Sequence, residues 1–231
     1  MATHLDLQEQ EQVDQLRDFW KQYGNLITWI VILALGGFAA WNGWNWWQRE
    51  QAGKASAMFD ELERAAQAGD AERSARVFTD LKDRFPRTAY AQQGALLAAK
   101  VQAENGQADA ALASLAWASD NAGDEELRMV ARLRAAGLLI DKKQYEAALA
   151  QLDAAAQGKY AKEFDALLAD RRGDVLLAQG KKDEARKAFD AAYKAIDEKL
   201  EYRRLIEAKL TALGAAPAPA ASAAAASGAT P

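Results

Sequence analysis

A repeat of 37 residues limits what this chain can fold into more than any other feature of its sequence. Glycine or lysine recurs four times at one position, which we name the turn column: Gly69, Gly106, Lys143 and Gly180. A repeat of this length is typical of stacked helix pairs, in which no pair can bury its apolar face alone. The sequence therefore predicts an all-α solenoid.

Four further columns recur with the turn column, and their residue types suit a helix pair. Glycine at a turn accepts a left-handed backbone at little cost, small residues let two helices cross closely, and large apolar residues fill the space between pairs. The first-helix column holds Leu62, Ala99, Ala136 and Gly173; the crossing column Ser74, Ala111, Ala148 and Ala185; the large column Phe78, Leu115, Leu152 and Phe189; and the closing column Leu81, Ala118, Ala155 and Ala192.

These columns predict about four helix pairs followed by a capping helix. The expected pairs are 55–68 with 71–84, 92–105 with 108–121, 129–142 with 145–157, and 166–179 with 183–196. Leu200 to Leu213 has apolar residues at helical spacing and is expected to cap the open end. We assign 49–213 to the repeat domain, and we expect the Ala/Pro-rich segment 214–231 to be disordered.

A membrane-spanning helix is predicted before the repeats, because no charged residue occurs from Gln22 to Gln48. Leu26 to Trp47 would span roughly 33 Å as a helix, and a hydrocarbon core is about 30 Å thick. Six of the seven tryptophans lie between Trp20 and Trp47, and tryptophan prefers the membrane interface. We therefore predict a transmembrane helix over 22–48, with the lipid bilayer as a partner and an acidic tail over 1–21.

The alternatives to a transmembrane helix are a buried core helix and a cleaved signal peptide. A buried core helix would rarely carry four tryptophans in seven residues beside a charge-free run. A cleaved signal peptide has a basic start and small residues after its apolar run, whereas this segment starts acidic and ends in tryptophans. An uncleaved anchor fits better. Its orientation stays open, because Arg17 and Lys21 before the span balance Arg49 and Lys54 after it.

Small residues at Gly36, Ala40 and Gly43 suggest that a second transmembrane helix packs on the span. The alternative is that these residues are ordinary members of a span, where small residues are common.

The composition argues against several classes of function. A net charge of −4 without a basic cluster excludes typical nucleic-acid binding. The chain has no cysteine, and its one histidine, His4, lies in the polar tail. Carboxylates occur beside Lys and Arg on exposed helix faces, as in solubilising charge pairs. We therefore predict no catalytic residues, no metal and no cofactor, and hence a protein that is not an enzyme.

Repeated helix pairs form a curved solenoid with a concave groove, which binds other polypeptides. The groove is expected to be lined by the first helix of each pair, and each lining residue could instead be an ordinary packing residue. By position in the repeat, the candidates are Phe59, Glu63, Gln93, Leu96, Lys100, Val130, Leu133, Asp170 and Asp174.

The columns resemble the tetratricopeptide (TPR) repeat, which has small residues at positions 8 and 20, glycine near 15, an aromatic residue or leucine at 24, alanine at 27 and proline at 32. The copy that starts at Gly173 (GDVLLAQGKKDEARKAFDAA) fits best, and Pro86 falls at position 32 of the first copy. Leu62 at position 8 and the lack of that proline in later copies are departures. The spacing exceeds the usual 34 residues, so we expect about three extra residues between helix pairs.

The whole chain resembles one family, the YfgM-like ancillary subunits of the bacterial SecYEG translocon. The resemblance rests on WKQYGNLITWIVILALGGFAAWNGWNWWQREQ and on the first repeat, which ends FPRTAYAQ. It implies an inner-membrane protein with a cytoplasmic N-terminus and periplasmic repeats. It also implies association with SecYEG and the periplasmic chaperone PpiD, and help in passing client polypeptides to chaperones. A scaffold for envelope assembly or cell division, and an enzyme or chaperone with isomerase activity, are the alternatives.

Overall fold

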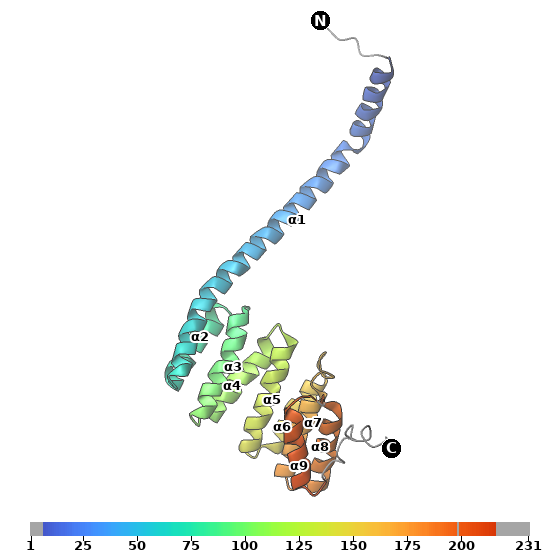
Figure 1. The fold of residues 1–231 in the computed structure, drawn as a ribbon. Helices are drawn as coiled ribbons and strands as arrows, with labels where there is room; N and C mark the ends of the chain where they lie inside the picture. Colours follow the sequence, from blue (N-terminus) through green and yellow to red (C-terminus); the bar gives the residue numbers. More distant parts are fainter. Residues whose placement is uncertain (1–6, 198, 216–231) are drawn as a thin grey trace, which may run out of the picture. The chain divides into compact units, whose positions relative to one another are not determined.

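The computed structural model describes residues 7–197 and 199–215. Those residues form nine α-helices and no strand, as Figure 1 shows. The helices are α1 (Leu7–Gln67), α2 (Ala71–Arg84), α3 (Ala89–Glu104), α4 (Ala108–Asn121), α5 (Glu125–Asp141), α6 (Tyr145–Ala156), α7 (Asp165–Ala178), α8 (Lys182–Ala195) and α9 (Tyr202–Ala212). The predicted all-α fold is confirmed. His4 and most of the Ala/Pro-rich segment lie outside the described residues.

The chain divides into two compact units, residues 1–53 and 54–231, and α1 contributes to both. In the first unit, α1 is already helical from Leu7, within the segment that the sequence analysis treated as an acidic tail. Among the described residues, α1 is the one helix long and apolar enough to cross a membrane. Its large apolar side chains from Phe19 to Trp47 are exposed, as expected of a helix that lies in lipid.

Polar groups within the predicted span find partners on the helix itself. The Thr28 hydroxyl donates a hydrogen bond to the Gly24 carbonyl at 2.7 Å, and the Asn42 amide donates to the Phe38 carbonyl at 3.0 Å. The rings of Trp44 and Trp47 lie 5.2 Å apart. Because lipid offers no hydrogen-bond partner, such local bonds lower the cost of placing Thr and Asn in a membrane.

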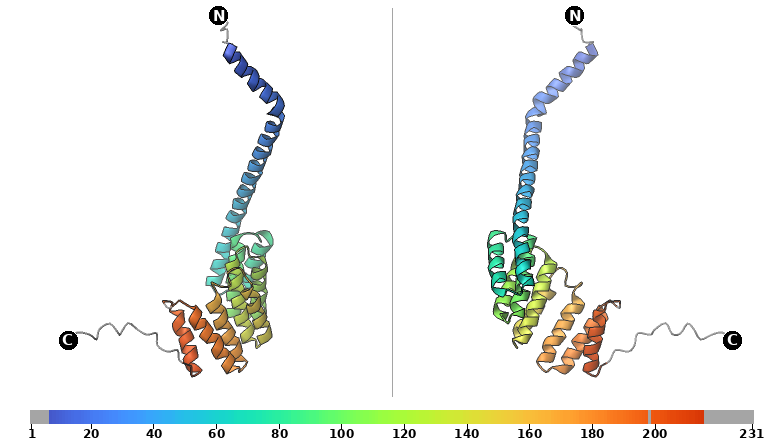
Figure 2. Two further views of the ribbon diagram at one scale, coloured as in Figure 1. Left: turned by 90° about the vertical axis from the view of Figure 1, so that its right-hand side faces the viewer. Right: turned by 60° about the vertical axis from the view of Figure 1, so that its left-hand side comes forward.

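In the second unit, the helices pack in pairs that follow one another in chain order, which Figure 2 shows from two sides. The pairs are residues 54–67 of α1 with α2, then α3 with α4, α5 with α6, and α7 with α8. The last helix, α9, packs on α8 and, through side chains, on α7. The predicted helix pairs and capping helix are therefore confirmed.

The turn column works as the sequence predicts. All four of its residues have a left-handed backbone, with φ between 56° and 80°. In the first turn, the Gly69 N–H donates to the Ala66 carbonyl and the Asp70 N–H donates to the Ala65 carbonyl, both at 3.0 Å. The same two bonds recur in the other three turns and again at Gly214. This arrangement satisfies the carbonyl groups at the end of a helix and reverses the chain.

The other four columns form the core. Every residue of the crossing, large and closing columns is at most 3% exposed, and the first-helix column is also buried. The core consists of three consecutive clusters, over α1–α5, α5–α7 and α7–α9. Each repeat therefore buries its apolar residues against its neighbours, which is why the columns recur.

The extra residues of each repeat were expected between helix pairs, and this prediction is right at only one junction. Eight residues, 157–164, connect α6 to α7. The connections 85–88 and 122–124 are short, and the extra length lies instead in α3, with 16 residues, and α5, with 17. The side chains of Thr88 and Asp124 accept hydrogen bonds from the N-termini of these two helices and fix their early starts.

Candidate protein-binding groove

The first helices of successive pairs line one face of the repeat unit. Besides packing on its own partner, α3 contacts α5, and α5 contacts α7. Such side-by-side first helices form the concave face of a TPR-like solenoid. Two adjoining pockets on this face, one between α3 and α5 and one between α1 and α3, form what we name the groove.

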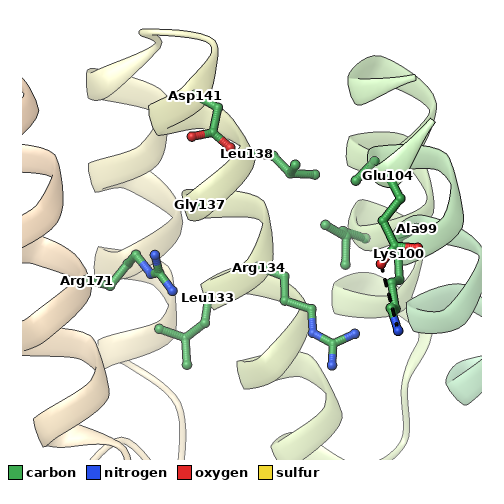
Figure 3. A pocket seen from close by; sticks show the side chains of 11 residues that line it. Ala99, Lys100, Glu104, Leu133, Arg134, Gly137, Leu138, Asp141 and Arg171 are labelled. Carbon is green, nitrogen blue, oxygen red and sulfur yellow. Dashed lines mark ion pairs between the residues drawn. The ribbon is translucent and has the colours of Figure 1, made fainter. Parts of the chain in front are cut away.

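The larger pocket, the α3–α5 pocket, has a volume of about 320 Å³. Its floor is apolar, and Arg171 reaches its wall from α7, as Figure 3 shows. The apolar residues that line it are Ala99, Ala103, Leu115, Leu133, Gly137 and Leu138. A surface of this kind can receive apolar side chains from another molecule.

Charged side chains surround this floor. Three cations, Lys100, Arg134 and Arg171, come from three different helices, and two anions, Glu104 and Asp141, lie nearer the C-terminal ends of α3 and α5. Figure 3 shows Asp141 at one end of the pocket and Arg134 toward the other.

The contacts that these three cations make with other described residues are long. Lys100 Nζ lies 3.8 Å from Glu104, Arg171 Nη1 lies 3.4 Å from Asp174, and Arg134 Nη1 donates to the Leu96 carbonyl at 3.4 Å. These contacts are at or beyond the usual length of a good hydrogen bond, so most of the donor groups remain free to bind a ligand.

The smaller pocket, between α1 and α3, has a volume of about 200 Å³. It shares Lys100 and Glu104 with the larger one, and Glu63 lines its far side. The two pockets therefore form one groove that crosses three repeats.

Three of the predicted groove residues, Glu63, Lys100 and Leu133, line these pockets. Gln93 is exposed on α3 outside them. The other three apolar candidates pack inside the repeat unit. Phe59 contacts the ring of Tyr90 at 5.7 Å, Val130 packs on the first core cluster, and Leu96 belongs to that cluster with 8% exposure.

The structure corrects the prediction that Asp170 lines the groove. Its carboxylate is 1% exposed, because α9 covers it. Lys209 Nζ donates to both Asp170 oxygens at 2.8 Å, and the Tyr202 hydroxyl donates to one of them at 2.7 Å. Asp170 therefore holds the capping helix and cannot contact a partner while α9 is docked.

Asp174 belongs to the same internal cluster. Lys209 Nζ lies 2.7 Å from one of its oxygens, and Arg171 pairs with the other. Burial raises the pKa of the Asp174 carboxyl above its usual value, although the hydrogen bond from Lys209 opposes this shift. Burial and the hydrogen bond to Asp170 also raise the pKa of the Tyr202 hydroxyl, which remains a hydrogen-bond donor well into the alkaline range.

The sequence analysis missed the arginines of the groove, although a signal for them existed. Arg134 and Arg171 occupy the same repeat position, nine residues before the turn column, and Leu97 holds that position in the second repeat. Charges on exposed helix faces are usually solubilising, and only their recurrence at one repeat position distinguishes these two arginines.

The predicted packing residues Gly36, Ala40 and Gly43 all lie on α1 and are exposed. A Cβ atom at Gly36 or Gly43 would meet nothing within 4 Å. Space for another helix therefore exists, and the packing role stays a prediction.

Residues 17–215 match the family described as a tetratricopeptide repeat-like domain. A protein of Neisseria gonorrhoeae named ancillary SecYEG translocon subunit is 30% identical over 92% of this chain and 100% of its own length. Proteins of the same name from Haemophilus influenzae and Escherichia coli are 32% and 30% identical, over 80% and 81% of this chain and 89% and 88% of their own lengths. The chain therefore belongs to the tetratricopeptide repeat-like YfgM family, whose named members are ancillary SecYEG translocon subunits.

Proposed function

We propose that this protein is a membrane-anchored, protein-binding subunit that associates with the SecYEG translocon. The observation that carries the proposal is the similarity to translocon subunits along nearly the whole chain, anchor and repeats included. The exposed apolar face of α1 and the groove on α3, α5 and α7 are two separate surfaces for such association.

The anchor would lie in the bacterial inner membrane, over residues 22–48, with the N-terminus in the cytoplasm and the repeat domain, 49–213, in the periplasm. The resemblance to the YfgM family supports this orientation, whereas the charges beside the span do not decide it. Alkaline phosphatase fused after Pro231 should be active, and a fluorescent protein that folds only in the cytoplasm should be dark there. The opposite pattern would reverse the orientation.

In the periplasm, the repeats would bind secreted or envelope polypeptides and pass them to chaperones, PpiD among them. A groove with an apolar floor and charged walls suits polypeptides that are not yet folded. A purely polar surface would not hold their apolar side chains.

Photocrosslinking tests the two surfaces separately. A photoreactive amino acid replaces Gly43 on α1 or Lys100 on α3, which lines both pockets of the groove, and Arg186 on α8 serves as a matched exposed control. Crosslinked partners are then identified by mass spectrometry after detergent extraction. The proposal expects translocon subunits from position 43, and chaperones or clients from position 100 but not from position 186.

Recovery of cell-division or envelope-assembly proteins without any translocon subunit would contradict the proposal and would favour a scaffold for those processes. Equal recovery of clients at positions 100 and 186 would contradict the role of the groove.

A further inference from the structure

The groove holds positive charge that the fold itself does not require. Arg134 is exposed, and its one bond to the described residues is to the Leu96 carbonyl at 3.4 Å, a carbonyl already inside a helix. A single long bond uses one of the five N–H donors of a guanidinium group. Removal of the Arg134 charge should therefore cost the fold little.

Cations from the neighbouring repeats line the same pocket as this arginine. Lys100 approaches from α3 and Arg171 from α7, and both line the same pocket. Figure 3 shows Lys100 and Arg134 among the side chains that line this pocket. Like charges side by side repel one another, and an anion between them would remove that repulsion.

The anions of the pocket do not neutralise this end of it. Asp141 lies seven residues after Arg134 on α5, which corresponds to roughly 10 Å along a helix axis. Glu104 pairs with Lys100 only at 3.8 Å, and both side chains are more than half exposed, a geometry that contributes little. Lys100 and Arg134 against Glu104 leave one excess positive charge at the Arg134 end of the pocket, and the apolar floor adjoins it.

We propose that the α3–α5 pocket binds an acidic segment of a partner polypeptide, with an apolar side chain seated on Leu133 and Leu138 and a nearby carboxylate paired with Arg134. Arginine suits this task, because its planar group binds both oxygens of a carboxylate at once. The inference rests on the proposed function in one respect, that the groove receives a polypeptide.

The volume of the pocket fits this occupant. About 320 Å³ is near the lower limit for a site that encloses a whole small molecule, which is roughly 300–1,000 Å³. The smaller pocket shares Lys100 and Glu104 with this one, so the two pockets adjoin and an occupant can extend from one to the other.

The test uses the full chain in phosphatidylcholine nanodiscs and three fluorescein-labelled peptides. The peptides share a central Leu-Phe-Leu and carry Glu, Gln or Lys at the flanking positions. Binding is measured by fluorescence anisotropy, with empty nanodiscs as the blank. We expect the Glu peptide to bind at least about fivefold more tightly than the Gln peptide at low salt, and the Lys peptide no more tightly than the Gln peptide. The preference should shrink at about 1 M salt, because the dissolved ions screen the attraction between charges.

Two variants and one control locate the site. Arg134→Gln should remove the preference for the Glu peptide, and Leu133→Ser should weaken the Glu and Gln peptides alike. Arg186→Gln, at an exposed arginine of α8, should change neither. Circular dichroism spectra that match the parent show that each variant is folded.

Equal binding of the Glu and Gln peptides, no binding of the Glu peptide, or an unchanged preference in Arg134→Gln would each overturn the inference. Its failure is distinct from failure of the proposed function. Translocon crosslinks from α1 without peptide binding would reject only the acidic site. Peptide binding that depends on Arg134 without translocon crosslinks would reject only the association.

Discussion

The first and last repeats fill two of the columns, the first-helix and the closing column, with residues of opposite size. In the first repeat, Leu62 and Leu81 are large where the last repeat has Gly173 and Ala192, yet all four residues are buried. In each repeat, a neighbouring residue of the opposite size compensates for this difference in side-chain volume. Near Leu62 and Leu81 stands Gly94, which has no side chain, and on Gly173 lies the ring of Phe189. The columns therefore preserve the packed volume of a repeat rather than the residue at each position.

The two repeats also differ where the groove passes over them. The position that holds Phe59, Leu96 and Leu133 in the first three repeats holds Asp170 in the last. The apolar residue is replaced by a buried carboxylate, which Lys209 and Tyr202 from α9 satisfy. At this position the last repeat thus meets its neighbour through a polar contact, whereas the earlier repeats have an apolar residue there. Elsewhere α9 packs on the last repeat through Ile206 and Leu210.

The largest effect is expected from Lys209→Met. The variant leaves the buried Asp170 carboxylate without its cation, and the free energy of unfolding should fall by about 3 kcal/mol. Urea unfolding of the full chain in detergent micelles, followed by circular dichroism, measures the loss. Lys194→Met, at an exposed lysine paired with Asp190 on α8, should change it by less than about 0.5 kcal/mol.

A second variant shows whether the polar contact itself is necessary. Asp170→Leu combined with Lys209→Met restores the residue type of the earlier repeats, and it should recover most of the lost stability because no buried charge is left unpaired at position 170. A double variant as unstable as Lys209→Met alone would mean that the last repeat cannot be closed by apolar packing.

Gly173→Ala comes next in expected size. The added Cβ would lie 2.5 Å from Cε1 of Phe189, and a buried ring cannot yield easily, so the loss should be about 2 kcal/mol. The matched control is Gly137→Ala, also inside a first helix, where the nearest atom is Arg171 Nη1 at 3.7 Å. Alanine there should leave stability unchanged or raise it, since alanine favours helix. Equal losses in both variants would show that the close approach of Phe189 is unimportant.

The first repeat allows a similar test, in which the added methyl group would face two leucine side chains instead of an aromatic ring. Gly94→Ala would bring a Cβ to 2.9 Å from Leu81 Cδ2 and 3.1 Å from Leu62 Cδ2, and it should cost about 1 kcal/mol because leucine ends can move. In a Leu62→Ala background the same change should be neutral or favourable, because Leu62→Ala leaves space for the new methyl group. Additive effects in this double-mutant cycle would contradict the idea of a shared volume.

The sequence predicted most of the fold because its signals are local and repeated. The turn column requires left-handed backbone at fixed intervals, and the small and large columns place the helices around it. The exchange of volume between Leu62, Leu81 and Gly94 was not predictable in the same way. It depends on contacts between helices, which no single column records.

The groove was predicted less well than the fold, for a physical reason. Glu63, Lys100 and Leu133 follow from position in the repeat, since each first helix presents the same face. Asp170 has the same position, but α9 covers that face at the end of the solenoid. A rule based on the repeat alone fails where the repeat stops, because the last unit has a different neighbour.

The smallest expected effect concerns the third turn, where Lys143 stands in the place that the first and last repeats give to glycine. Its φ of 56° is costly for a residue with a Cβ atom, so Lys143→Gly should raise the free energy of unfolding by about 0.5–1 kcal/mol. The reciprocal Gly106→Lys, at a φ of 75°, should lower it by a similar amount. Both are measured by the same urea unfolding. If both variants lost stability, the side chain of Lys143 would have to contribute more than its strained backbone costs, and the turn column would record a contact as well as a conformation.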